Sequence, residues 1–106
     1  MRFSYAESMC DPHQLPTLAI EAEQAGYHSF TVPESICYPK ESDSKYPYTA
    51  DGNREFLDGK PFIEPFVLMG ALGAVTERIR FTTFVVKLPM RHPVLTAKQA
   101  TSVAYM

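Results

Sequence analysis

Hydrophobic positions along the chain alternate between patterns typical of β-strands and patterns typical of α-helices. Residues 2–6 and 28–33 are short runs rich in aromatic and β-branched residues, which predicts two strands. Between them, apolar residues recur at helical spacing, which predicts one amphipathic helix. Its apolar face consists of Leu15, Leu18, Ala19, Ala22 and Ala25.

Both ends of this first helix carry recognisable signals. Asp11-Pro12 is an N-cap residue followed by proline at the first helical position. Pro16 would remove a backbone hydrogen bond from a helix interior, so we expect the regular helix to begin near residues 13–15. Gly26 is expected to end it, in the position that favours a left-handed conformation.

The second half of the chain repeats the alternation after a long irregular stretch. Residues 34–60 show no periodicity, and loops this long are usually functional or mobile. Glu64-Pro65 begins a second helix to about Thr76, apolar nearly all round and so expected to be buried on most sides. Residues 79–88 form a nearly unbroken apolar run, which predicts a strand buried on both faces. His92-Pro93 opens a third helix that continues to the last residue.

The resulting βα-βα-βα order predicts an α/β fold with a parallel sheet and right-handed crossovers. We treat residues 1–106 as part of one domain, with the long loop 34–60 after the second strand. Three parallel strands leave two open edges and would be marginally stable alone. We therefore expect a larger α/β structure, or a homo-oligomer formed through the open strand edges or the faces of that structure.

Composition narrows the function classes. The chain is 45% hydrophobic and 21% charged, which excludes general disorder. No apolar run is long enough for a membrane helix, and the first residues do not resemble a secretory signal. A net charge of −2 without a basic stripe gives no reason to expect nucleic acid as a partner. Two cysteines are typical of a reducing compartment, so we expect a cytoplasmic protein.

Three segments are similar to a known family. They are EAEQAGYHSFTVPES (21–35), YPYTADG (46–52) and the pattern ALxAVTERIR…LPxRHPVxxAKQ over residues 71–99. They resemble the N-terminal part of luciferase-like oxidoreductases, which are flavin-dependent monooxygenases and relatives that use coenzyme F420, a 5-deazaflavin. The resemblance implies a (β/α)8 TIM barrel of which this chain supplies the first three βα units. It also implies hydride transfer or oxygen activation on a small organic substrate, with F420 preferred over FMN because of residues 46–52.

The resemblance places the active site at the carboxyl ends of the strands. After the first strand this edge contains residues 7–10, Glu7 to Cys10 with Ser8 among them. After the second strand comes Glu34, which we expect to be the catalytic, proton-handling group, with its pKa raised by desolvation. The alternative is that Glu34 only orders the loop through backbone hydrogen bonds. Ser35 stands where relatives often have histidine, and we expect it to contact the cofactor.

The third strand and the helix after it supply the other expected cofactor contacts. Thr83, Phe84 and Val85 would support the ring from behind, on a bulge that in relatives often contains a cis peptide bond, here near Phe84–Val85. The alternative is an ordinary buried strand. Arg91 and His92 precede a helix N-terminus, which favours anions such as a phosphate or carboxylate. The alternative is that His92 caps the helix and Arg91 pairs on the surface.

Further alternatives remain open. The loop aromatics either cover the ring as a lid or pack the loop onto the barrel; they are Tyr38, Tyr46, Tyr48 and Phe56. A metal-dependent hydrolase would need Cys10, His13, Cys37 and Glu34 as ligands, but their spacing matches no compact zinc pattern, so we expect no metal and two ordinary thiols. The alternative function is a non-catalytic fragment or assembly module that needs a partner or the C-terminal part of the fold.

Overall fold

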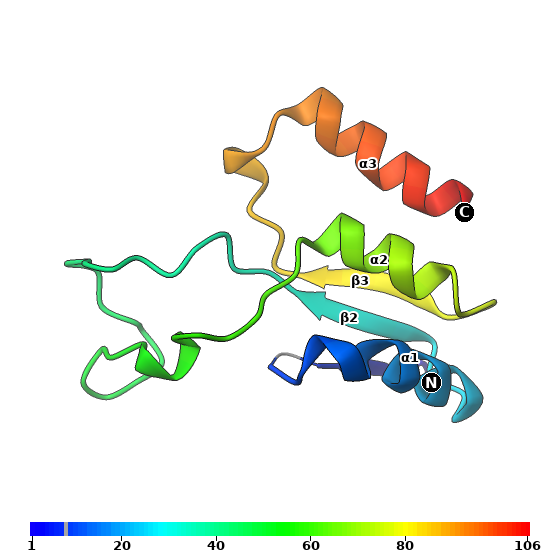
Figure 1. Ribbon diagram of the computed structural model, residues 1–106, viewed down its shortest axis with the longest axis horizontal. Helices are drawn as coiled ribbons and strands as arrows, with labels where there is room; N and C mark the ends of the chain where they lie inside the picture. The colour runs from blue at the N-terminus through cyan, green and yellow to red at the C-terminus, as the bar shows by residue number, and fades with distance from the viewer. Residues whose placement is uncertain (8) are drawn as a thin grey trace.

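The computed structural model describes residues 1–7 and 9–106, so Ser8, placed above at the carboxyl edge, lies outside the described residues. Strands and helices alternate along the chain (Figure 1). They are β1 (Ser4–Ala6), α1 (Leu15–Gln24), β2 (Ser29–Pro33), α2 (Pro65–Gly73), β3 (Arg80–Phe84) and α3 (Pro93–Tyr105). Short 3₁₀ turns occupy Pro12–Gln14, Glu55–Leu57 and Leu88–Met90.

The three strands form one parallel sheet in the order β1-β2-β3, which confirms the predicted α/β fold. Ser4 is in register with Ser29, and Ser29 with Arg80, so all strands begin at the same edge. Their carboxyl ends therefore meet at the opposite edge, where Pro33 is in register with Phe84. The long loop leaves the sheet at this carboxyl edge (Figure 1).

The first helix begins and ends as its sequence predicts. Pro12–Gln14 form a 3₁₀ turn in which the Asp11 side chain accepts a hydrogen bond from the N–H of His13, and α1 follows with Pro16 in its first turn. At the other end Gly26 has a φ of 84°. The N–H groups of Gly26 and Tyr27 donate to the carbonyls of Glu23 and Ala22 over 3.0 Å each. This pair of bonds is a Schellman motif, which ends the helix and turns the chain into β2.

The hydrophobic core lies between the sheet and the first two helices. Phe30 and Val32 of β2 are fully buried and point to the same side of the sheet. The rest of the core comes from α1, α2 and the residue before β3; these residues are Leu15, Ala19, Ala22, Leu68, Met69, Leu72 and Ile79. This core fixes the central strand and so positions the residues at its carboxyl end.

The opposite face of the sheet carries hydroxyl groups. The Ser4 and Ser29 hydroxyls lie 2.5 Å apart and the Thr31 and Thr82 hydroxyls 2.8 Å apart, so neighbouring strands are also linked through their side chains. Burial in β3 alternates from residue to residue. The first, third and fifth residues of the strand, Arg80, Thr82 and Phe84, are exposed on this face. The expected burial of the third strand on both faces is therefore wrong, as is its expected extent over 79–88.

The second helix ends earlier than expected and is less buried. It ends at Gly73 and not near Thr76, whose hydroxyl instead donates to the Leu72 carbonyl over 2.9 Å and so caps the C-terminal turn. Although α2 is apolar nearly all round, Val67 is exposed. The reason is that α1, β2 and α3 contact only part of its surface. In the described part of the chain, no helix is both long and apolar enough to span a bilayer.

The turn between α2 and β3 is held by a carboxylate from α1. Glu23 Oε1 accepts the N–H groups of Glu77, Arg78 and Ile79 at 3.0, 2.6 and 2.8 Å. These backbone hydrogen bonds, with those from Arg78 and Ile79 largest, lower the pKa of Glu23 below its ordinary value of 4.5. The charged Glu23 side chain therefore connects the turn before β3 to α1 through hydrogen bonds.

Replacing Glu23 with glutamine is expected to destabilise the protein at neutral pH and to matter less in acid. Because the pKa of Glu23 is lowered in the folded state, its contribution is present above the ordinary pKa and is lost as the pH falls through the folded-state pKa. Urea unfolding of both proteins at about pH 7 and about pH 3 measures this. Glu21→Gln, at an exposed position on the same helix, is the control; an equal effect of the two variants would contradict the expectation.

Candidate functional site

Four charged side chains converge at the carboxyl edge of the sheet. Glu34 directly follows β2, Lys87 follows β3, and Arg91 and Glu64 stand just before α3 and α2. The sequence places these residues far apart, but the parallel topology brings the ends of their elements to one edge (Figure 1). The edge is thus the site in this chain where chemistry-bearing groups meet.

Glu34 is the centre of this cluster. It is only 8% exposed, and both carboxylate oxygens are occupied. Oε2 accepts the backbone N–H of Lys87 over 2.7 Å, and Oε1 accepts a hydrogen bond from the Arg91 guanidinium. The backbone carbonyl of Glu34 also accepts a hydrogen bond from the Lys87 ammonium group. Glu34 therefore binds the chain after β3 through its side chain and its backbone.

Arg91 joins Glu34 to the start of α2. Its second terminal nitrogen donates to Glu64 Oε1 over 2.8 Å, and its guanidinium lies 5.5 Å from the centre of the Phe66 ring. The other oxygen of Glu64 accepts the N–H of Val67 over 2.8 Å and so caps α2. The Arg91 side chain is only 16% exposed, so the expected pairing of Arg91 holds, but not its place on the surface.

The pKa of Glu34 lies below its ordinary value, and the expectation that it is raised is wrong. Burial does favour the neutral carboxyl group, but the hydrogen bond from Arg91, the Lys87 N–H and the positive charges of both residues together outweigh it. The same pairing raises the pKa of Arg91, with the hydrogen bond to Glu34 as the main cause. Glu34 is therefore a bound anion at neutral pH, and these contacts favour the alternative in which it orders the loop.

The chain bulges where β3 ends. Pro33 is in register with Phe84, but Glu34, the next residue, binds Lys87. Pairing with β2 ends there, so Val85 and Val86 lie between Phe84 and Lys87 outside the sheet, and we call these two residues the bulge. The peptide bond between Phe84 and Val85 is cis, as the family resemblance implies for this position. The alternative of an ordinary strand through these residues is therefore excluded.

The bulge presents apolar side chains to solvent. Phe84 is 70% exposed and Val85 is 57% exposed, whereas Thr83, one residue earlier, is half-buried in β3. Ser35 lies at the start of the loop, where its hydroxyl donates to the Cys37 carbonyl over 3.4 Å. The carboxyl edge thus brings Phe84 and Val85 together as an exposed apolar surface beside the charged cluster.

His92 stands apart from the cluster. It occupies the N-cap position of α3, but its side chain makes no capping hydrogen bond and is exposed. The expected place of His92 as the helix cap is therefore confirmed, but it caps through its carbonyl, which accepts the Thr96 N–H over 2.9 Å, and not through its side chain. The cation of Arg91, expected to face an anion of a ligand, is instead taken up by the carboxylates of Glu34 and Glu64.

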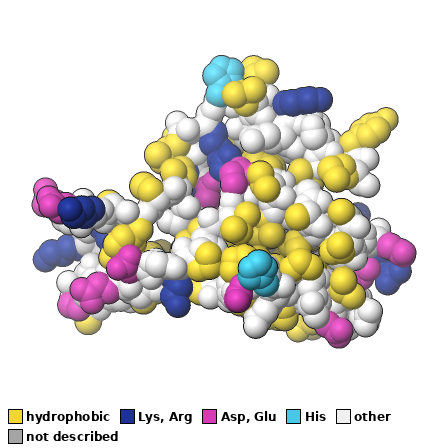
Figure 2. All heavy atoms as spheres, viewed as in Figure 1, with side chains coloured by type: hydrophobic (Ala, Val, Ile, Leu, Met, Phe, Trp, Pro, Cys, Tyr) yellow, Lys and Arg dark blue, Asp and Glu magenta, His cyan; other side chains and the backbone are white. Residues whose placement is uncertain are grey.

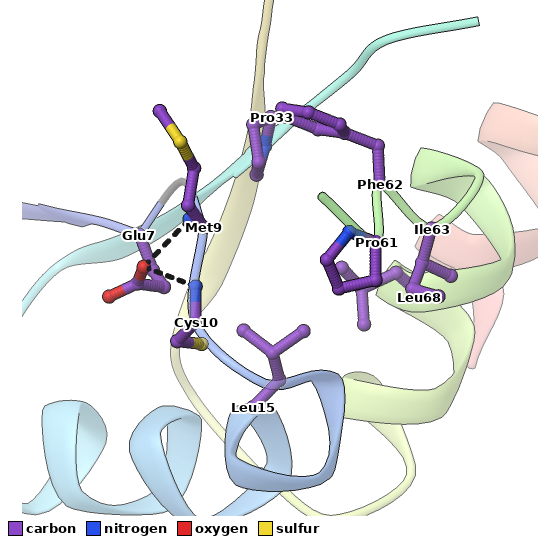
Figure 3. A pocket seen from close by; sticks show the side chains of 9 residues that line it. All are labelled: Glu7, Met9, Cys10, Leu15, Pro33, Pro61, Phe62, Ile63 and Leu68. Carbon is purple, nitrogen blue, oxygen red and sulfur yellow. Dashed lines mark hydrogen bonds between the residues drawn. The ribbon is translucent and has the colours of Figure 1, made fainter. Parts of the chain in front are cut away.

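A small cavity lies beside the cluster, between the end of β1 and the segment before α2 (Figure 3). Its volume is about 20 Å³, enough for one water molecule. The Glu7 carboxylate accepts the N–H groups of Met9 and Cys10 over 3.0 and 3.1 Å and closes one side. Burial and the Glu7 carboxylate raise the pKa of the Cys10 thiol. This cavity is too small for a ring system.

The long loop is organised by its own side chains. The ring of Tyr46 packs edge-on against Tyr48 and Phe56, with centres 5.5 and 5.2 Å apart. Arg54 donates to the hydroxyls of Ser42 and Ser44 over 2.9 Å each. Figure 2 shows charged side chains of both signs gathered on this loop. These three aromatic residues pack on one another; whether they also cover a ligand stays a prediction.

The cysteines and carboxylates do not form a metal site in the part of the chain that the structure describes. Within residues 1–7 and 9–106, no three His, Cys, Asp or Glu side chains lie close enough to share an ion. Cys10 and Cys37 are free thiols. The metal-dependent alternative, which needed Cys10, His13, Cys37 and Glu34 together, has no support in this arrangement.

Sequence reasoning missed two members of the charged cluster. The sequence marks Glu64 only as the start of a helix, and Lys87 only as part of the expected strand over residues 79–88. Lys87 binds Glu34, 53 residues earlier, and Glu64 binds Arg91, 27 residues later, and no local pattern indicates such pairings. The one available signal was topological, since both residues stand next to strand or helix ends at the same edge.

Two curated proteins of Mycobacterium tuberculosis are similar in sequence to most of this chain. The Uncharacterized protein Rv0940c of Mycobacterium tuberculosis is 68% identical over 104 residues, a match covering 98% of this chain and 36% of that protein. The Uncharacterized protein Rv0953c of the same organism is 34% identical over 86 residues, covering 80% of this chain and 30% of that protein. The chain thus spans about a third of the length of the curated relatives it matches.

A solved structure shares the fold. The crystal structure of riboflavin lyase (RcaE) with modified FMN and substrate riboflavin superposes with a TM-score of 0.67, covering 97% of this chain and 26% of that chain at 14% identity. At this identity the likeness shows the fold alone, which here is the first three βα units of a barrel of that type. Residues 3–106 match the family described as luciferase-like monooxygenase, and the chain belongs to that family.

Proposed function

We propose that the carboxyl edge around Phe84 and the Val85–Val86 bulge holds the ring of a flavin-type redox cofactor. The polypeptide that carries this chain would then act as a luciferase-like oxidoreductase on a small organic substrate. The observation that carries the proposal is the exposed apolar surface of Phe84 and Val85 at the edge where barrel enzymes place their chemistry. An aromatic ring system is the kind of ligand that such a surface fits.

The residues at this edge fit the ring of the cofactor better than its phosphate. Val85 and Phe84 offer apolar contact, whereas Arg91 is neutralised by Glu34 and Glu64, and the Lys87 ammonium group donates to the Glu34 carbonyl. A phosphate group would therefore be bound by residues other than this arginine. Thr83 and Ser35 remain proposed polar contacts, and exposed His92 remains a proposed contact at the N-terminus of α3.

The protein's part in the reaction is to place the ring and shield it from water. When bound, a reduced flavin or deazaflavin supplies hydride transfer or oxygen activation. The bulge would support one face of the ring, and Glu34 would keep that bulge in place. The long loop would lie on the solvent side of the site, where loops commonly gate access. The two free thiols are compatible with the cytoplasm, which we propose as the compartment.

We infer a preference for coenzyme F420 over FMN from the similarity of residues 46–52 to the deazaflavin-using branch. Titration of the polypeptide, as its host produces it, with each coenzyme separately would test this preference by fluorescence quenching. Tighter binding of F420 is the expected result. Tighter binding of FMN would reverse the preference but leave the proposed ring site intact.

Replacing Val85 with aspartate is expected to weaken binding of the ring about tenfold or more, because a carboxylate facing an apolar ring must be desolvated. Val85 is 57% exposed, so the free energy of unfolding should change by no more than about 0.5 kcal/mol. Val67→Asp, at an exposed valine on α2, is the matched control and should bind the ring as the unmodified protein does. Equal binding by the two variants would contradict the proposed site.

A second role, as an assembly module, is favoured by the open sheet. In the described part of the chain β1 and β3 each have one unpaired edge, and α3 has no buried residue. A homo-oligomer or a partner chain would cover these surfaces. The intact mass of the polypeptide made by its host, followed by light scattering, tests this role. A mass of 11.9 kDa with a defined oligomer would support it, and a larger polypeptide that is monomeric would count against it.

A further inference from the structure

We propose that Glu34 and Arg91 are positioning residues that hold the Val85–Val86 bulge in place for the cofactor ring, and that Glu34 does not itself move a proton in the reaction. This inference rests on the proposed function of the carboxyl edge. It assigns a role to a buried ion pair that the redox chemistry itself does not need. It also names the two residues on which the shape of the ring-binding surface depends.

Both ends of the bulge are fixed to the end of the central strand, at Pro33, its last residue, and at Glu34, the residue that follows. At one end Phe84 is in register with Pro33. At the other end Lys87 is bound twice by Glu34, through its N–H to the carboxylate over 2.7 Å and through its ammonium group to the backbone carbonyl. The two residues between them have no other anchor on β2. The position of the bulge is therefore set by Glu34.

Arg91 fixes the orientation of Glu34. The guanidinium binds Glu34 Oε1 on one side and Glu64 Oε1, 2.8 Å away, on the other. Glu64 in turn caps α2 through the N–H of Val67. A planar guanidinium can bind two carboxylates in a fixed geometry, which a lysine ammonium cannot reproduce. The ion pair therefore ties the bulge to α2 and to the start of α3.

Each carboxylate oxygen of Glu34 already accepts a hydrogen bond from a neighbouring residue. Oε1 is taken by Arg91 and Oε2 by Lys87, and the side chain is 3% exposed. A general base must reach the proton it removes, directly or through one water. A buried carboxylate whose two oxygens both accept hydrogen bonds and which is held anionic serves better as a fixed acceptor, and its effect on the cofactor is transmitted through the bulge.

The test is a double-mutant cycle with Glu34→Gln, Arg91→Lys and the double variant, made in the polypeptide as its host produces it. FMN and coenzyme F420 are the probes, and binding is followed by fluorescence quenching and by the absorption spectrum of the bound ring. Each single variant should bind the ring about tenfold more weakly and shift its spectrum, because misplacement of a support by about 1 Å is costly. The double variant should be no weaker than the weaker single variant, since both residues act through one contact.

The control is a surface ion pair. Glu77 and Arg78 lie 3.6 Å apart with side chains 83% and 71% exposed, so Glu77→Gln and Arg78→Met should leave the binding and the spectrum unchanged. Amide hydrogen exchange supplies a readout without cofactor: the N–H groups of Val86 and Lys87 should exchange faster in both single variants than in the controls. Arg91→Lys keeps the charge, so it remains informative if Glu34→Gln does not fold.

The outcomes separate this inference from the proposed function. If the unmodified polypeptide binds neither ring, the proposed function fails and this inference fails with it. If it binds a ring and both single variants bind, absorb and exchange as it does, this inference alone is overturned. If Glu34→Gln abolishes turnover with unchanged binding while Arg91→Lys is fully active, Glu34 handles a proton and the positioning role is wrong.

Discussion

Replacing Arg91 with methionine is expected to lower the free energy of unfolding by about 3 kcal/mol at neutral pH, because the buried carboxylate of Glu34 loses its cation. The Glu34 side chain is 3% exposed and that of Arg91 16% exposed, so water cannot readily replace the lost partner. The Lys87 N–H still binds Glu34 in the variant and keeps the loss from being larger. Urea unfolding of the two proteins measures the difference.

The loss caused by Arg91→Met should shrink in acid. In the unmodified protein the pKa of Glu34 is lowered, so the stability it contributes is present above its ordinary pKa of 4.5 and is lost as the pH falls through the lower folded-state pKa. Without Arg91, burial dominates and the carboxyl group is protonated more readily, which removes the unpaired charge. The Glu34→Gln/Arg91→Met double variant should therefore be more stable than Arg91→Met alone. Strictly additive losses, or an equal loss in Arg78→Met, would contradict the buried pair.

Replacing Phe30 with alanine is expected to cost about 4 kcal/mol of unfolding free energy. Phe30 is completely buried in the central strand and packs against Tyr5, with ring centres 5.4 Å apart. Truncation would leave a cavity between the sheet and the first two helices, where the surrounding residues cannot all move inward. Denaturant unfolding monitored by circular dichroism gives the value.

Phe84 is the matched control for Phe30. It has the same side chain in the neighbouring strand but is 70% exposed on the other face, so Phe84→Ala should change the stability by no more than about 0.5 kcal/mol. The same variant should weaken ring binding, because Phe84 belongs to the proposed ring surface. Equal destabilisation by the two truncations would mean that the carboxyl edge is part of the core and not a binding surface.

Local signals in the sequence predicted the elements well. Asp11-Pro12 and Pro16 marked the start of α1, and Gly26 marked its end, because capping depends on a few neighbouring residues. The βα order predicted the parallel sheet, since parallel strands require crossover connections. The family resemblance added the bulge with its cis peptide bond at Phe84–Val85, which hydrophobic periodicity alone does not indicate.

Long-range contacts account for what the sequence did not predict. The third strand ends at Phe84, opposite the last residue of β2, and the Glu34 side chain then binds Lys87; the residue pattern over 79–88 cannot reveal either feature. The direction of the Glu34 pKa was wrong because its cation, Arg91, lies 57 residues later and was expected on the surface. Burial of a carboxylate could be predicted from its place after a core strand, but its partners could not.

Binding of a flavin-type ring at the carboxyl edge around Phe84–Val86 is tested most directly by backbone amide NMR shifts when FMN or coenzyme F420 is added to the polypeptide as its host produces it. We expect the largest shifts at Val85 and Val86, with smaller ones at Ser35 and none at the opposite edge near Tyr27. Shifts centred near Tyr27, or saturable binding of either coenzyme that leaves Val85 and Val86 unmoved, would contradict it.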